Sequence, residues 1–113
     1  MPDNQLQMFK AQFFRALGHP VRIKILELLV HRPRTVQELQ AALKLDQPLV
    51  SQQLAVLRNQ NVVTATKKGL SVRYELRDSA VGDLLEVARR IFNNQLISTQ
   101  GLLRELQREA RRR

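Results

Sequence analysis

The sequence contains no cysteine, which removes several classes of chemistry at once. Without a thiol the chain has no disulfide bond, no thiolate metal site, no cysteine nucleophile and no thiol redox switch. Acidic residues are also few, since ten Asp and Glu stand against nineteen Lys and Arg, for a net charge of +9. This balance favours a polyanionic partner, and charge alone does not choose between nucleic acid and an anionic membrane.

Long apolar runs are absent as well. No stretch of about 18 uncharged apolar residues occurs, and the opening MPDNQLQMFK lacks a basic start followed by an apolar run. We therefore expect a cytoplasmic protein with no membrane partner. At 113 residues the chain fits one domain, residues 1–113, small enough for a second chain to complete its core.

Apolar residues at helical spacing are present from the start. The stripe over residues 6–17 predicts a helix that Gly18 closes. Pro20 predicts the start of a second helix, with His19 capping it or packing beside it, and Pro33 predicts its end. The inward positions expected of this second helix are Val21, Ile25, Leu28 and Leu29.

Two short helices with a tight link come next. Thr35 and Glu38 have the form of a capping box that begins the first of them. After the link KLD, Asp46 is expected to cap the second helix and Asn61 to end it in the left-handed conformation. This layout predicts a helix-turn-helix.

After Asn61 the pattern becomes that of strands. VVTATKK and SVRYEL flank Gly69, which predicts a two-stranded hairpin that must lean on the helices. From Ser79 onward helical spacing returns for about 30 residues, with Gly101 as a candidate break. The sequence therefore predicts a mainly α fold with a small β-hairpin wing, a winged helix-turn-helix.

The second helix of the predicted pair has an uncharged polar face. Its apolar residues Val50, Leu54 and Leu57 lie in one narrow sector, and Gln52 lies opposite with Ser51 at its flank. Ser and Gln hydrogen-bond to base edges, and Gln pairs with adenine through two bonds. A solvated surface is the alternative, but the helix before and the basic hairpin after favour DNA reading.

Positive charge gathers at the predicted hairpin turn. Lys67, Lys68 and Arg73 lie near Gly69, where long cationic side chains reach phosphates beside the minor groove. Charged turns also keep edge strands soluble, so the cluster by itself decides little. After a helix-turn-helix, it favours a winged-helix protein that binds DNA.

Three segments follow one another over roughly residues 10–78: FFRALGHPVRIKILELL, VSQQLAVLRNQNVV and GLSVRYELRD. They resemble the opening segment, the recognition helix and the wing of the ArsR/SmtB family of bacterial winged-helix repressors. The resemblance implies a homodimer on double-stranded DNA, whose recognition helices enter successive major grooves of an imperfect palindrome.

The resemblance also implies which residues approach the DNA. Gln52 has the position that most often reaches a base edge, and Arg58 is expected to reach a phosphate. Thr35 and Gln37 begin the preceding helix, whose N-terminal amides can bind phosphate. The Thr35 hydroxyl is explained equally well as a helix cap alone. The further positions expected at the DNA are Arg34, Gln47, Ser51 and Gln53.

Surplus apolar surface agrees with a dimer. The first and last predicted helices carry more apolar stripe than a 113-residue monomer covers, so we expect them to pack across a two-fold axis. Completion of a monomer core is the alternative. The residues predicted at the dimer interface are Leu6, Phe9, Phe13, Leu84, Ala88, Ile91, Phe92 and Leu96.

The ligand sets of the metal-sensing family members are missing. TVQ at residues 35–37 stands where these members have Cys-Val-Cys, and a second family site keeps only Asp78, which is better explained as a helix cap. Its other matching positions are Ala80, Ile91 and Asn94. We predict no metal and no other cofactor.

The remaining ionisable groups leave two questions open. Nickel or another borderline ion, held by His with Asp83, Glu86 or a terminal group, is not excluded, although His31 suits the end of a helix dipole instead. The arginine-rich end is either a solvated helix end or an extra contact to phosphate or an acidic partner. It comprises Arg108, Arg111, Arg112 and Arg113.

Together these features predict a sequence-specific transcription regulator, most simply a dimeric repressor. Its signal is then an organic ligand or a separate sensor protein. The alternatives are a protein-interaction module and an activator that works with a separate sensor protein. An enzyme is not expected, because no Ser-His-acid arrangement, glycine-rich phosphate loop or paired carboxylate site is present.

Overall fold

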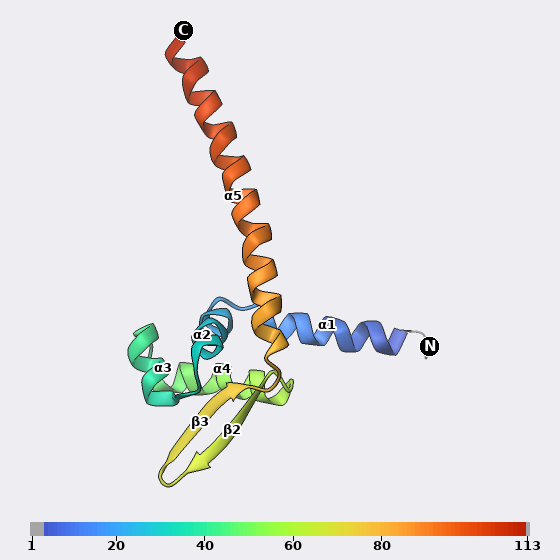
Figure 1. Ribbon diagram of the computed structural model, residues 1–113, viewed down its shortest axis with the longest axis vertical. Coiled ribbons are helices and arrows are strands. Elements are labelled where there is room, and N and C mark those ends of the chain that lie inside the picture. The colour runs from blue at the N-terminus through green and yellow to red at the C-terminus, as the bar shows by residue number, and fades with distance from the viewer. Residues whose placement is uncertain (1–3, 113) are drawn as a thin grey trace. The chain divides into compact units, whose positions relative to one another are not determined.

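The computed structural model describes residues 4–112, which divide into two compact units with the boundary after Gly82. The first unit holds α1 (Gln5–Leu17), α2 (Pro20–His31), β1 (Arg34–Thr35), α3 (Val36–Leu43), α4 (Gln47–Asn59), β2 (Val63–Lys68) and β3 (Ser71–Leu76). Figure 1 labels its helices and the strands β2 and β3. α5 (Ala80–Arg112) begins in it and forms the second unit. A helical domain with a small antiparallel sheet confirms the predicted winged helix-turn-helix.

Local signals set most helix ends as predicted. His19 caps α2, because its Nδ1 accepts a hydrogen bond from the Val21 N–H at 3.1 Å, and Pro20 is the first helical residue. Asn61 has the predicted positive φ, 60°. The prediction for Asp46 is wrong in one respect: the residue occupies the N-cap position of α4, but its side chain makes no capping hydrogen bond.

The core of the first unit lies where α2, α3, α4 and the sheet meet. On α2 the buried residues are Ile25, Leu26 and Leu29, whereas Val21 and Leu28 are only half-buried, which corrects the predicted inward face. α2 contacts α3, α4 and β3, so its buried side is broader than one stripe. The other fully buried side chains include Leu39, Val50, Leu54, Leu57, Val62 and Val63.

The sheet has three strands in the order β1-β3-β2, one more than predicted. β1 pairs with β3 through Arg34↔Tyr74 and Thr35↔Arg73, and at two residues it is too short to leave a pattern in the sequence. β2 and β3 form the predicted hairpin around Gly69, which has the left-handed φ of 61°. Along β3 half-buried residues alternate with exposed ones, so one face leans on the helices.

The second unit is the body of α5. The helix runs through Gly101 without a break, contrary to the sequence-based candidate. From Arg89 to Arg111 its residues are exposed, including the large apolar side chains of Ile91, Phe92 and Leu96. Within residues 4–112 no helix is long and apolar enough to cross a membrane.

Candidate nucleic-acid interface

The helix-turn-helix is formed by α3, α4 and the three residues between them. Thr35 and Glu38 start α3 with the predicted capping box. Lys44 ends it in the left-handed conformation, with φ 56°, and its N–H donates to the Gln40 carbonyl at 2.8 Å. The tight link KLD was predicted, but the left-handed conformation of Lys44 was not, because a lysine with positive φ gives no signal in the sequence.

The recognition helix α4 packs against the core through one face and exposes the opposite face to solvent. Val50, Leu54 and Leu57 are buried, as predicted, while Gln52 is exposed. Ser51 is half-buried, and its hydroxyl accepts a hydrogen bond from the Gln47 side-chain amide at 3.3 Å. Gln47, Ser51 and Gln52 thus lie together on the first two turns of the helix, where neutral donors and acceptors can meet base edges.

Gln53 does not belong to this open face. It is only 7% exposed, and its side-chain oxygen accepts a hydrogen bond from Arg22 Nη1 at 2.8 Å. The polar group of Gln53 thus points to α2 and not to the open face of α4, so this conformation does not favour the contact with DNA, which stays a prediction. The helical position of Gln53 could have indicated its burial, because Gln53 lies next to the buried Leu54 and three residues after Val50.

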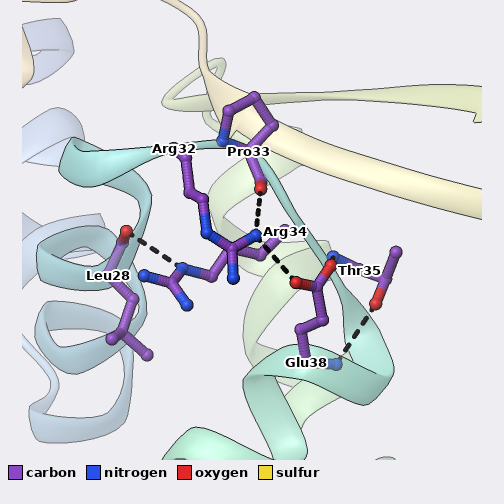
Figure 2. A network of polar contacts seen from close by, with 6 residues as sticks. All are labelled: Leu28, Arg32, Pro33, Arg34, Thr35 and Glu38. Carbon is purple, nitrogen blue, oxygen red and sulfur yellow. Dashed lines mark hydrogen bonds and ion pairs between the residues drawn. The ribbon is translucent and has the colours of Figure 1, made fainter.

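The start of α3 carries a compact polar network (Figure 2). The Thr35 hydroxyl accepts from the Glu38 N–H at 3.2 Å, and the Glu38 carboxylate accepts from the Thr35 N–H at 3.1 Å. Arg32 Nη1 donates to the same carboxylate at 2.7 Å. This hydrogen bond and that from the Thr35 N–H lower the pKa of Glu38 to about 2. The Thr35 side chain is thus a helix cap, whatever else it contacts.

Two neighbours of this network differ in exposure. Arg34 is half-buried and its Nε donates to the Leu28 carbonyl at 3.2 Å, so the predicted phosphate ligand also ties β1 to the end of α2 (Figure 2). Gln37 is exposed on the first turn of α3. Both positions remain available to a phosphate near the helix start, and their contact with DNA stays a prediction.

The wing presents the predicted cations to solvent. Lys67 and Lys68 are exposed at the end of β2, and Arg73 is exposed on the central strand β3, paired with Thr66 on one side and Thr35 on the other. Arg73 therefore joins the charge of the wing to the start of α3, which the sequence did not reveal because β1 was missed.

A further cation lies near the end of the recognition helix. Arg58 is exposed in the last turn of α4, and it lines a cleft of about 260 Å³ together with Arg77. Val63 and Ala65 of β2 also line this cleft. Arg77 follows β3 directly in the chain, so two arginines distant in sequence line one cleft.

Candidate metal ligands do not gather in the part of the chain that the structure describes. Among residues 4–112 no group of three or more His, Cys, Asp or Glu side chains is close enough to hold an ion. Asp78 acts as the predicted cap, since its carboxylate accepts from the Ala80 N–H at 2.9 Å. His31 is the exposed last residue of α2.

The predicted dimer positions differ in exposure. On α1, Leu6 and Phe9 are exposed at 58% and 70%, and Phe13 is half-buried. On α5, Leu84 and Ala88 are half-buried, whereas Ile91, Phe92 and Leu96 are exposed. The exposed members are the ones that a second chain can cover, and their pairing stays a prediction.

Comparison with known proteins decides the family. Residues 19–65 match the family model described as "Bacterial regulatory protein, arsR family", which spans α2 to the start of β2. The HTH-type transcriptional regulator Rv0081 of Mycobacterium tuberculosis is 40% identical over 107 residues, which cover 94% of each chain. The chain belongs to the ArsR family.

Two solved structures share the fold. The crystal structure of Mycobacterium tuberculosis Rv0081 superposes with a TM-score of 0.77 at 42% identity, over 83% of this chain and 95% of that one. The transcriptional repressor BigR from Xylella fastidiosa has a TM-score of 0.70 at 29% identity, over 81% of this chain and 92% of its own. The ArsR family consists of DNA-binding transcription regulators, which confirms that this protein is a regulator and not an enzyme.

Proposed function

We propose that this protein is a dimeric repressor that acts in the cytoplasm and binds an imperfect palindromic operator. The observation that carries the proposal is the open, uncharged face of α4, where Gln47, Ser51 and Gln52 lie above a buried row of apolar residues. In this arrangement α4 enters the major groove, and Gln52 reads a base edge. Two copies read the two half-sites.

Charged residues around α4 supply affinity without sequence preference. Lys67, Lys68 and Arg73 of the wing contact the backbone on one side of the helix, and Arg58 contacts it at the other end. The N-terminal amides of α3 hold a further phosphate beside Gln37. The net charge of +9 favours rapid association with DNA.

Repression follows most simply from occupancy of a promoter. BigR, which shares the fold at 29% identity, is named a transcriptional repressor, and this supports the same sign of regulation here. No resident metal is part of the proposal. Release is assigned to an organic ligand or a separate sensor protein that shifts the dimer away from the spacing that DNA requires.

A gel shift with the DNA upstream of the gene tests the proposal. The purified protein should retard this DNA at concentrations that leave a shuffled sequence of the same length free. A variant with Ser51→Ala and Gln52→Ala should lose this preference and still dimerise. Equal retardation of both DNAs by the wild type would reject sequence-specific repression.

The same assay addresses the signal. Addition of nickel or zinc should leave the complex intact if no metal is sensed. Release by either ion would show a metal site that the proposal does not contain, and would assign the metal as the inducer. Transcription from the upstream promoter in a purified system then distinguishes repression from activation.

A further inference from the structure

One guanidinium group joins three helices of the first unit. Arg22 lies on α2, is half-buried, and donates from all three nitrogens of its side chain. Nε donates to the Ala16 carbonyl at 2.6 Å, and Nη2 donates to the Arg15 carbonyl at 3.2 Å. Nη1 donates to the Gln53 side-chain oxygen at 2.8 Å. Arg22 therefore links the end of α1 to the recognition helix α4.

The α1 side of this link meets a structural need. Ala16 lies in the last turn of α1, where carbonyl groups lack an intrahelical partner. The neighbouring Arg15 carbonyl accepts from the Gly18 N–H at 3.1 Å as well as from Arg22. Ala16 is only 3% exposed, although Arg15 beside it is exposed. The planar, permanently charged group of Arg22 supplies donors in a fixed geometry, which a flexible lysine ammonium does not.

The α4 side of the link fixes how the recognition helix is rolled about its axis. Gln53 is the one buried polar side chain in the part of the chain that the structure describes. Its side-chain oxygen accepts the hydrogen bond from Arg22. Gln52 precedes it, so the two side chains point about 100° apart on the same helix. Any roll of α4 that releases Gln53 from Arg22 turns Gln52 through the same angle.

We propose that Arg22 is a positioning residue for DNA reading: it sets the roll of α4 through Gln53 and makes this roll depend on the end of α1. The inference rests on the proposed function, in which Gln52 reads a base. A cleft of about 250 Å³ opens beside the link and is lined by Gln12, Arg15, Ala16, Arg22, Val56 and Gln60. A displacement of the end of α1 thus acts on α4 through Arg22, in addition to the direct contacts between the two helices.

The experiment compares specific with non-specific DNA binding. Gln53→Met removes the acceptor at nearly constant volume, Arg22→Met removes the donors, and the double variant removes both. Affinity for the upstream DNA should fall about tenfold in each, as expected for a lost hydrogen bond to a charged group. Affinity for shuffled DNA should change little, and the double variant should be no worse than Arg22→Met, because both changes break one link.

Matched variants separate positioning from other causes. Gln53→Glu keeps an acceptor for Arg22 and should restore most of the preference for upstream over shuffled DNA. Gln60→Ala removes an exposed glutamine that lines the same cleft, and it should leave both affinities unchanged. Gln52→Ala removes the proposed base contact and should lower the preference in its own right.

The outcomes distinguish this inference from the function on which it rests. If Gln52→Ala lowers the preference and Gln53→Met does not, α4 reads DNA but Arg22 does not position it. If Gln53→Met lowers thermal stability and both affinities in parallel, the link is merely structural and the inference is overturned. If the wild type shows no preference, both proposals fail. If Arg22→Met does not fold, the comparison of Gln53→Met with Gln53→Glu still tests whether the link positions α4.

Discussion

Thr35 and Glu38 satisfy each other's backbone at the start of α3, each side chain accepting a hydrogen bond from the other residue's N–H, at 3.2 and 3.1 Å. The exchange fixes the first turn of α3, the helix that precedes the recognition helix α4. Because one N–H loses its partner when the hydroxyl is removed, Thr35→Ala should lower the free energy of unfolding by about 1 kcal/mol. Urea denaturation measures this change.

Thr35→Ser is the matched control, since a serine hydroxyl accepts the same hydrogen bond. It should be nearly as stable as the wild type. If Thr35→Ala weakens DNA binding and Thr35→Ser does not, while both fold fully at the assay temperature, the hydroxyl serves the DNA as well as the cap. Equal stability of all three proteins would contradict the role of the cap.

The Glu38 carboxylate should make the stability of the domain depend on pH in the acid range. Hydrogen bonds from Arg32 and from the Thr35 N–H lower the pKa of Glu38 from 4.5 to about 2. A lowered pKa in the folded state means that the stabilisation is complete above pH 4.5 and is lost as the pH falls through about 2. Unfolding at a series of pH values between 7 and 2 should reveal this loss.

Glu38→Gln isolates the contribution, because other carboxylates titrate over the same range. The amide still accepts from the Thr35 N–H but carries no charge for Arg32. The difference in unfolding free energy between wild type and Glu38→Gln should shrink steadily below pH 4.5. A difference that stays constant with pH would mean that the ion pair with Arg32 adds no stability in solution.

The sequence predicted this region well because its signals are local. A capping box needs only two residues three positions apart, and the apolar spacing of α4 needs only one helix. Glycine at a hairpin turn is equally local, since Gly69 supplies the positive φ that the turn requires. The helices, the wing and the outward direction of Gln52 could therefore be predicted.

Contacts between distant residues could not be predicted in the same way. Gln53 reads as polar and exposed until Arg22, 31 residues earlier, is brought beside it. β1 owes its existence to pairing with β3, because two residues have no periodicity of their own. Lys44 takes a positive φ that its residue type does not favour, at the turn between the packed helices α3 and α4.

The wing should contribute to DNA affinity through charge rather than through sequence. Lys67→Gln with Lys68→Gln removes two exposed cations from the end of β2. If each contacts a phosphate, the slope of log K against log salt should fall by about two, and affinities for specific and shuffled DNA should weaken together. Fluorescence anisotropy at several salt concentrations measures this slope.

Lys10→Gln with Lys24→Gln is the control for net charge. These lysines are exposed on α1 and α2, away from the wing in sequence, and their removal lowers the charge by the same amount. The control should change the salt slope much less than the wing variant. Equal effects of the two variants would mean that the wing acts only through the overall charge of the protein.

Dimerisation should depend on the exposed apolar side of α5. Phe92 and Leu96 are 57% and 61% exposed and lie four residues apart, so they share one face of the helix. Phe92→Glu with Leu96→Glu should convert the dimer to a monomer, because pairing would bury two like charges without partners. Sedimentation velocity at several concentrations reports the change.

Leu70→Glu controls for charge on an exposed leucine, since Leu70 is 104% exposed at the hairpin turn and is not a predicted dimer residue. It should remain dimeric. The monomeric α5 variant should keep its thermal unfolding transition for the first unit but lose affinity for the palindrome, because one copy of α4 reads one half-site. An α5 variant that stays dimeric would place the dimer interface elsewhere. A wild type that sediments as a monomer at every concentration would reject the dimer.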